Sequence, residues 1–456
     1  MLALFNRHLA QPLLAWKAGS PHLRHLRTLE QTQYDLPDVI RARQLDAVRE
    51  VVRHAWLTVP YYRARWKAAG LRPDAIRSLD DLRQFPIVSK ADVRLHADDL
   101  RSDAYRGATV VSKSTSGSTG VPLTIVWDVE SKDWKRACTL RSDQWSGWRM
   151  GTRVARLWGH GPAERGTLKD RLWRHLIARE SYLNTLGIDA GRLRAFARHL
   201  RRKPPGLLFG HAHSLYLFAA HVRAHCPGTI RPDGVVSGAM MLHDWQRGVI
   251  EEAFGRPVTN RYGCEEVSLI ACECEEHRGL HLNADSVFCE VVPDARLGAG
   301  PGAGRLLVTD LTNRAMPLIR YQVGDVVVPS TRLCACGRRL PLIERVVGRE
   351  ADYVLTPGGM LISGISLTDH FATEIRGAAQ VQIVQERLKL LRLRMVAGDG
   401  FGPDSHRQIE DLVRNTFGPE MRYEVELVDA IPPEPSGKYR FCVSPVATAY
   451  LKSLAP

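Results

Sequence analysis

The sequence lacks the features that would direct the chain into or across a membrane. Its amphipathic N-terminus, MLALFNRHLAQPLLAWK, is interrupted by Arg7, His8 and Pro12, and it is too short and too polar to span a bilayer. It also lacks the charged start and the small-residue cleavage site of a secretion signal. We therefore expect a cytoplasmic protein without a transmembrane segment.

Signs of a disulfide framework and of nucleic-acid binding are scarce as well. The nine cysteines are an odd number, and in a large chain without a signal they are expected to be thiols or metal ligands. The 63 Lys and Arg residues exceed the 49 Asp and Glu residues, which gives a net charge of +14. This charge suits an anionic ligand or a membrane surface, but no basic stretch is interleaved with aromatic residues. A solvated arginine-rich surface is the simpler interpretation, and no nucleic-acid partner is expected.

What the sequence does contain predicts a large α/β protein. The 456 residues, of which 44% are hydrophobic, suffice for two to three domains or for one large domain with an appendage. The spacing of apolar residues up to about residue 99 is helical. Further on, short apolar or β-branched runs alternate with amphipathic helical stretches. We predict a large body with mixed sheets over residues 1–347, mainly helical over 1–99, and a small α+β domain over 348–456.

The stretch STSGSTGVP, residues 114–122, is rich in hydroxyl side chains and glycine. Such a loop presents many backbone N–H and side-chain O–H donors to one point, which suits a chain of phosphates. It lacks the lysine and serine that end the P-loop of ATPases. Since Ser/Gly loops are also common as flexible turns, this stretch alone leaves both interpretations open.

Further motifs follow in a fixed order: VSGAMM (236–241), RYGCEEV (261–267), IRYQVGDVV (319–327), VGRE (347–350) and PSGKYR (435–440). Together with the Ser/Thr/Gly loop they resemble the adenylate-forming superfamily of acyl-CoA synthetases, adenylation domains and luciferases. Within that superfamily, three longer stretches resemble the phenylacetate–CoA ligase family and its CapK-type relatives, which are associated with capsule polysaccharide clusters. These stretches are VPYYRARWKAAGLRPDAIRSLDDLRQFPIVSKADVR, AMPLIRYQVGD and CACGRRLPLIERVVGR.

The resemblance implies an enzyme that joins a carboxylic acid to AMP, releases pyrophosphate and passes the acyl group to coenzyme A. It also implies ATP and Mg²⁺ as cofactors, a mobile C-terminal lid domain and a possible homodimer. One alternative is a CapK-type enzyme of capsule or envelope polysaccharide biosynthesis that passes the activated group to an acceptor other than coenzyme A. Another is a catalytically silent scaffold. The identity of the acid stays open, because pocket specificity depends on the shape of a few side chains.

The same resemblance assigns the nucleotide site. Lys438 would bridge the carboxylate and the α-phosphate, and Glu266 would bind Mg²⁺, with Glu265 as its neighbouring competitor. Asp325 would accept hydrogen bonds from both ribose hydroxyls, and Arg349 would reach the ribose or a phosphate. The other residues expected to hold the phosphates or line the adenine are Ser114, Thr115, Ser116, Gly117, Ser118, Thr119, Gly120, Gly238, Ala239, Tyr262 and Gly263.

The sequence departs from the family pattern at the hinge of the lid domain. The position after the Gly348–Arg349–Glu350 run usually holds Asp or Lys, whereas this chain has Ala351 followed by Asp352. The hinge function would therefore pass to Asp352 or be altered. This departure bears on acyl transfer to coenzyme A more than on adenylation.

Two cysteine-rich stretches, CECEEH and LCACGR, suggest a metal site. Short Cys-x-Cys pairs from separate loops can build a tetrahedral zinc centre. Since some members of this branch carry a comparable structural zinc, we expect Cys274, His277, Cys334 and Cys336 as ligands, with Cys272 as a substitute for Cys274. The alternative is a set of reduced surface thiols.

Several residues that follow predicted strands are candidates for binding the acid. Trp158, His160, His211 and His213 follow apolar runs, and the ends of sheet strands often face a ligand crevice. The alternative for each of them is ordinary packing or loop capping.

Overall fold

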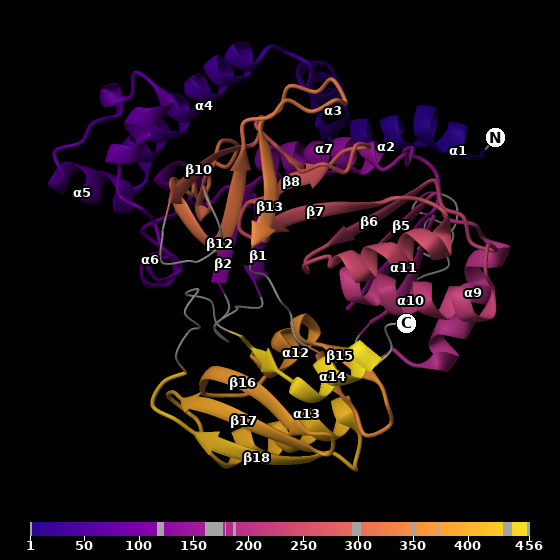
Figure 1. Ribbon diagram of the computed structural model, residues 1–456. Coiled ribbons are helices and arrows are strands. Elements are labelled where there is room, and N and C mark those ends of the chain that lie inside the picture. The colour runs from indigo at the N-terminus through magenta and orange to yellow at the C-terminus, as the bar shows by residue number, and fades with distance from the viewer. Residues whose placement is uncertain are drawn as a thin grey trace. The chain divides into compact units, whose positions relative to one another are not determined.

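A computed structural model describes residues 2–115, 123–159, 177, 179–185, 188–293, 302–347, 353–372, 374–431 and 440–453. The chain forms two compact units. Figure 1 shows its helices and strands, coloured along the chain. The first unit comprises Met1–Thr115, Leu123–Thr152 and Thr259–Gly348, and the described part of the second unit comes from Arg153–Val258 and Arg349–Pro456. The predicted domain boundary near residue 348 stays a prediction.

The N-terminal part of the first unit is helical, as predicted. Its α- and π-helices are α1 (Leu2–Phe5), η1 (Asn6–Ala10), α2 (Gln11–Lys17), α3 (His22–Thr32), α4 (Pro37–Thr58), α5 (Pro60–Ala68) and α6 (Lys90–Leu95), and the 3₁₀ turns are η2 (Pro73–Ala75), η3 (Leu79–Gln84) and η4 (Asp103–Tyr105). Pro37 and Pro60 occupy the first positions of α4 and α5, where the missing N–H leaves no bond unmade. Val48, Val51 and Val52 form a buried stripe on α4.

The strands of the first unit are mostly antiparallel. A hairpin of β1 (Val110–Thr115) and β2 (Leu123–Asp128) leads into α7 (Val129–Trp145). The remaining strands follow the order β10-β11-β12-β13-β9-β8-β7. Their bounds are β7 (Val258–Cys264), β8 (Ser268–Glu273), β9 (Leu280–Leu282), β10 (Val287–Pro293), β11 (Gly304–Asp310), β12 (Tyr321–Ser330) and β13 (Leu342–Val347).

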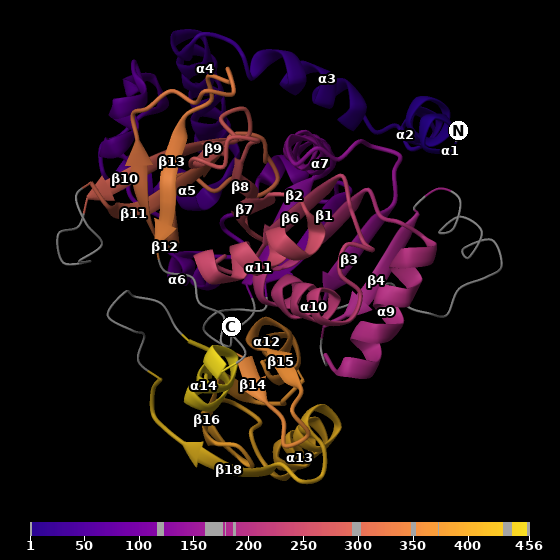
Figure 2. The ribbon, with the colours of Figure 1, turned by 45° about the vertical axis from the view of Figure 1, so that its right-hand side comes forward.

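The second unit contains a parallel set of strands in the order β6-β5-β3-β4. These are β3 (Val154–Trp158), β4 (Glu180–Asn184), β5 (Leu207–His211) and β6 (Gly234–Gly238), accompanied by α9 (Ala190–Arg202), α10 (Ala212–His225) and α11 (Asp244–Phe254). Every residue of β5 and β6 is buried, as expected for parallel strands covered on both faces. Figure 2 shows α9 lying beside β4.

The C-terminal part of the second unit is a compact α+β fold, which agrees with the predicted fold class. Its elements are β14 (Tyr353–Leu355), β15 (Leu361–Ser363), α12 (Gly364–Phe371), β16 (Ala378–Arg387), β17 (Leu390–Ala397), α13 (Pro403–Phe417), β18 (Arg422–Leu427), β19 (Cys442–Val443) and α14 (Pro445–Ser453). The sheet order is β18-β17-β16-β19. Ile409, Val413 and Phe417 recur every fourth residue along α13 and are buried in the core that the sheet also lines. None of the described helices combines the length and the apolar content needed to cross a bilayer.

Candidate active site

Part of the predicted nucleotide site lies outside the described residues. Of the Ser/Thr/Gly stretch, Ser114 and Thr115 end strand β1, where Thr115 pairs with Leu123 of β2 in antiparallel register. The predicted residues outside the described ranges are Ser116, Gly117, Ser118, Thr119, Gly120, His160, Arg349 and Lys438.

Tyr262 and Asp325, both predicted nucleotide ligands, meet in the first unit. The Tyr262 hydroxyl donates a hydrogen bond to Asp325 Oδ2 at 2.6 Å, and both side chains are buried. Tyr262 lies on β7 and Asp325 on β12. Because the acceptor is a carboxylate, this bond is stronger than one between neutral groups. The next residue, Gly263, admits no side chain, since an added Cβ would lie 2.4 Å from the carbonyl oxygen of Ser268.

Glu266 follows β7 and is also bound to β12. Its Oε1 accepts a hydrogen bond from the Tyr321 hydroxyl at 2.9 Å, and Lys90 Nζ lies 3.6 Å from the same oxygen. Its backbone carbonyl accepts a bond from Trp127 Nε1 at 3.2 Å. The segment 262–266 is thus joined to the segment 321–325 by two buried hydrogen bonds, from Tyr262 to Asp325 and from Tyr321 to Glu266.

The surroundings of Glu266 keep it ionised. Its burial by itself would raise the pKa of the carboxyl, but Lys90, a backbone N–H and Tyr321 outweigh that effect, and the pKa is lowered. Burial and the nearby Glu266 charge raise the pKa of Tyr321, so its phenol stays protonated and able to donate. An ionised, fixed carboxylate of this kind is a suitable ligand for Mg²⁺.

Lys90, Tyr321 and Trp127 were not predicted as parts of the site. Lys90 begins α6 directly after the capping residue Ser89, which accepts a hydrogen bond from the backbone N–H of Asp92. A lysine in a capped helix start is too common to mark a site. Tyr321 stands four residues before Asp325, as Tyr262 stands four residues before Glu266, and only the sheet structure reveals that these two pairs face each other.

Trp158, His211 and Gly238 end the parallel strands β3, β5 and β6 of the second unit. His211 pairs in register with Gly238, and the His211 ring stacks on Trp158 with a centroid distance of 3.9 Å. Carboxyl ends of parallel strands are the usual place for a ligand in an open α/β sheet. Ala239, which follows β6, has a φ of +64°, an unusual conformation for a residue with a side chain.

Several buried polar atoms in this part of the second unit have no hydrogen-bond partner among the described residues. Within the described structure, both ring nitrogens of His211 and the hydroxyls of Ser214 and Ser237 are buried without a hydrogen bond. His213 bonds through Nδ1 to Gln246 Nε2 at 3.1 Å, whereas its Nε2 has no partner. Burial lowers the pKa of His211 to about 4, so the ring is neutral at physiological pH. Buried polar groups without partners are rare and call for an explanation.

Three cysteines and a histidine converge elsewhere in the first unit. The ligand atoms of Cys274, His281, Cys334 and Cys336 all lie within 4.8 Å of one another. Cys274 Sγ is 3.6 Å from Cys334 Sγ, and Cys336 Sγ is 3.3 Å from His281 Nε2. His281 Nδ1 lies 3.3 Å from the carbonyl oxygen of Leu340. Donation from Nδ1–H to that carbonyl would leave Nε2 available to a metal, the arrangement usual for metal-binding histidines.

The group of converging side chains contains His281 and not His277, the histidine that we predicted as a zinc ligand. His277 Nδ1 lies 3.2 Å from Glu273 Oε2 and does not join the group. His281 does, because it lies on β9, which pairs with β13 through Leu342 and with β8 through Cys272. Cys272 is buried and does not join the group either. Strand pairing, rather than distance along the chain, brings the fourth residue to the cysteines.

Comparisons with known proteins cover most of the chain. Residues 354–445 match the family described as the CapK C-terminal domain. The chain is 27% identical over 326 residues to a phenylacetate-coenzyme A ligase of Thermus thermophilus, covering 70% of this chain and 72% of the relative. It is 22% identical over 374 residues to Protein CapK of Staphylococcus aureus, covering 80% of each. These matches confirm the resemblance predicted from the motifs.

A solved structure with the same fold is that of 2-hydroxyisobutyryl-CoA ligase in complex with 2-HIB-AMP and CoA. The TM-score is 0.57 at 20% identity, and the match covers 91% of this chain and 92% of that one. At this identity the likeness concerns the fold. It agrees with the predicted α/β body and C-terminal α+β part.

Proposed function

We propose that this chain is an ATP-dependent ligase that activates a carboxylic acid as acyl-AMP, releases pyrophosphate and transfers the acyl group to coenzyme A. The observation that carries the proposal is the pair of buried hydrogen bonds joining residues 262–266 to residues 321–325. Three predicted nucleotide ligands, Tyr262, Glu266 and Asp325, are held by these bonds. The similarity to phenylacetate-coenzyme A ligases over 70% of the chain supports the same reaction class.

In the first step an oxygen of the acid attacks the α-phosphorus of ATP, and the bond to pyrophosphate breaks. Asp325 would hold the ribose hydroxyls, and Tyr262 would lie against the adenine while its hydroxyl orients the Asp325 carboxylate. Glu266 would hold Mg²⁺, which neutralises negative charge on the phosphates. The roles of Lys438, Arg349 and residues 114–120 rest on the motif resemblance.

The acid would bind at the ends of β3, β5 and β6. The stacked rings of Trp158 and His211 offer a flat surface, and the unpaired His211 nitrogens and Ser237 hydroxyl offer hydrogen bonds inside a buried place. We expect an aromatic acid, in line with the substrate that the ligase relatives are named for. A hydrogen-bonding substituent on its ring would find a partner in His211 or Ser237.

The cysteine cluster would hold a structural zinc ion. Three thiolates and one imidazole form a ligand set typical of closed zinc sites. The ion would fix the turn holding Cys334 and Cys336 against β8 and β9, with no part in the reaction.

We further propose that the enzyme acts in the cytoplasm. We also propose that it forms a homodimer, and light scattering on the purified protein would measure that oligomeric state.

A second candidate function is favoured by two of the comparisons. The C-terminal match is to the CapK C-terminal domain, and the similarity to Protein CapK covers 80% of both chains. A CapK-type enzyme would keep the adenylation step and pass the activated group to an acceptor other than coenzyme A, in polysaccharide biosynthesis.

Pyrophosphate release with ATP, Mg²⁺ and a panel of aryl, fatty and hydroxy acids tests the common first step. Parallel reactions with and without coenzyme A, followed by mass spectrometry, separate the two acceptors. Acyl-coenzyme A formation supports the ligase. Pyrophosphate release without any thioester would favour the CapK-type reaction, and silence across the panel would reject both.

A further inference from the structure

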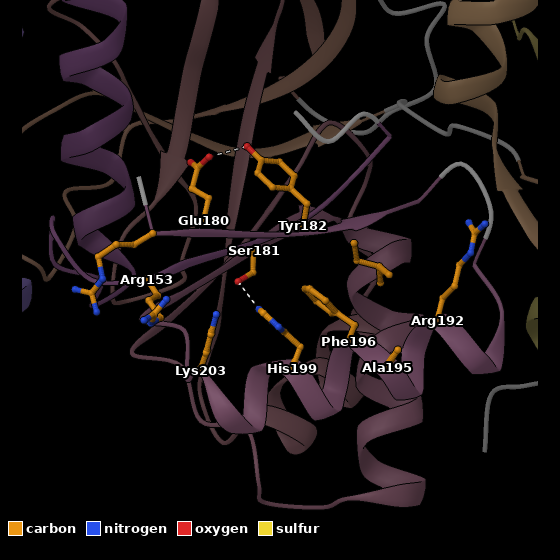
Figure 3. Close-up of a pocket in the computed structure, with 11 residues that line it drawn as sticks. Arg153, Glu180, Ser181, Tyr182, Arg192, Ala195, Phe196, His199 and Lys203 are labelled. Carbon is orange, nitrogen blue, oxygen red and sulfur yellow. Dashed lines mark hydrogen bonds between the residues drawn. The ribbon is translucent and has the colours of Figure 1, made fainter. Parts of the chain in front are cut away.

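A cavity of about 420 Å³ lies between the strand β4 and the helix α9 of the second unit (Figure 3). In the strand order of the described residues β4 is the last strand, so one of its edges faces no other strand there. Four successive residues of β4, Glu180 to Leu183, line the cavity. Its volume falls within the range of roughly 300–1,000 Å³ that is usual for small-molecule sites.

One face of α9 forms the opposite wall. Arg192, Phe196, His199 and Lys203 follow one another at intervals of three or four residues, the spacing of a single helix face. Figure 3 shows them in a row, with Arg192 at one end and Lys203 near Arg153 at the other. Phe196 supplies an apolar surface between the charged ends.

The charge of the lining is strongly positive. Arg153, Arg179, Arg192 and Lys203 all line the cavity. Within the described part of the chain, neither Arg153 nor Lys203 has a carboxylate within ion-pair distance. Arg153 and Lys203 lie near each other at one end of the cavity (Figure 3). Their like charges repel each other and favour an anion that would offset them.

Glu180, the acidic residue of the lining, does not balance the charges of Arg153 and Lys203. Glu180 Oε1 accepts a hydrogen bond from Arg156 Nε at 3.1 Å, and Oε2 accepts one from the Tyr182 hydroxyl at 2.8 Å. Both oxygens therefore have partners that do not include Arg153 or Lys203.

The positive charges of Arg153 and Lys203 also shift the pKa values of neighbouring residues. Burial, followed by the charges of Lys203 and Arg153, lowers the pKa of His199. Burial and then Arg153 lower the pKa of Arg179. His199 Nε2 lies 2.9 Å from Ser181 Oγ, which holds the ring at the cavity wall. A neutral imidazole is a hydrogen-bonding group that a phosphate can use alongside the charged ones.

We propose that the cavity between β4 and α9 binds a phosphate group of a small molecule, with Arg153 and Lys203 as its cationic ligands. A phosphate has several acceptor oxygens and a charge that two cations can balance. Phe196 would contact the part of the molecule attached to the phosphate. Two sources share this chemistry: the 3′-phosphate of coenzyme A, which rests on the proposed function, and the phosphate of another small ester.

Isothermal titration calorimetry on the full chain tests the proposal with coenzyme A, dephospho-coenzyme A and inorganic phosphate as probes. The variants are Arg153→Gln and Lys203→Gln. They are made separately, so that if one of them does not fold the other can still be measured. Arg202→Gln is the matched control, because Arg202 is an exposed cation of the same helix that does not line the cavity. Circular dichroism checks that each variant is folded.

Each cavity variant should weaken phosphate-dependent binding about tenfold or more, as expected for a lost charge-assisted hydrogen bond, and Arg202→Gln should not. If coenzyme A loses affinity in the variants and dephospho-coenzyme A does not, coenzyme A is the source. If inorganic phosphate loses affinity and coenzyme A does not, the ligand is another ester. Unchanged binding of all probes, or equal weakening in Arg202→Gln, would overturn the proposal.

Pyrophosphate release in the absence of coenzyme A separates this proposal from the proposed function. If release is normal and phosphate binding is unaffected by the variants, the cavity proposal fails alone. If release is absent with every acid and phosphate binding still depends on Arg153 and Lys203, the proposed function fails and the cavity proposal stands.

Discussion

Two buried polar regions of this molecule differ in how completely they are satisfied. In the first unit, Tyr262 is bonded to Asp325 and Glu266 to Tyr321, with Lys90 close by. In the second unit, His211, Ser214 and Ser237 bury polar atoms without partners. A satisfied network fixes its members in one arrangement, whereas unsatisfied buried groups lower stability and suit a place that a ligand completes.

This difference in hydrogen bonding matches the ligand that each region would bind, ATP in the first unit and the acid in the second. ATP is the same in every reaction of such an enzyme, so a rigid, preorganised site is an advantage. The acid is the variable substrate, and its polar groups would complete the second region. Replacing residues in the satisfied region should therefore harm both stability and adenylation, while an apolar replacement in the unsatisfied region should harm activity only.

The largest effect is expected from Glu266→Gln. Removal of the ionised carboxylate should lower kcat/KM for pyrophosphate release about 100-fold or more, because charge on the phosphates is no longer neutralised through this ligand. The control is Glu265→Gln, since Glu265 is exposed and adjacent. Equal losses in both variants would contradict the assignment of Mg²⁺ binding to Glu266 rather than to its neighbour Glu265.

The cysteine cluster extends the comparison to a third buried region. His281→Ala should abolish stoichiometric zinc, measured by plasma mass spectrometry, and should lower the melting temperature by roughly 5 °C, because a structural metal contributes directly to folding. His277→Ala should keep the zinc, since His277 lies against Glu273 instead. Zinc lost only in His277→Ala would show that His277, and not His281, is the ligand.

Tyr262→Phe examines the satisfied region by removing a single hydroxyl. Asp325 then loses a hydrogen-bond donor, so the free energy of unfolding should fall by about 1–3 kcal/mol and the KM for ATP should rise about tenfold. Calorimetry and initial rates measure the two quantities. A variant that is as stable as the parent would show that the bond contributes nothing to the network.

His211→Phe examines the unsatisfied region by keeping a flat ring and removing two unpaired nitrogens. Stability at pH 7 should be unchanged or higher, while turnover of the acid falls. Because burial lowers the pKa of His211 from 6.5 to about 4, the unfolded state binds a proton first as the pH drops below 6.5. This histidine therefore contributes stability above that pH which is lost as the pH falls towards 4.

The variant should lose about 2 kcal/mol less stability between pH 7 and pH 5 than the parent protein does. Thermal unfolding at the two pH values measures it, with His8→Gln as the control because His8 is exposed. If the parent and His211→Phe lose the same stability over this range, the ring is not held neutral by burial.

The sequence allowed prediction of the helical N-terminal part, the α/β body and the C-terminal α+β part, because each has its own apolar spacing or turn signals. Asp325 and Glu266 could be predicted as nucleotide ligands because they stand in recognisable motifs. Lys90 and Tyr321 were missed because their contact with Glu266 depends on segments far apart in the chain. The position of His281 beside the cysteines was not predicted for the same reason, since the register of β9 against β8 cannot be read from spacing.

Acid-dependent exchange of labelled pyrophosphate into ATP, in the absence of coenzyme A, tests the central claim most directly. This exchange requires reversible formation of an acyl-adenylate. We predict exchange with at least one acid of the panel, retained in Glu265→Gln and lost in Glu266→Gln. Thioester formation without any exchange, or exchange that is unchanged in Glu266→Gln, would contradict the account.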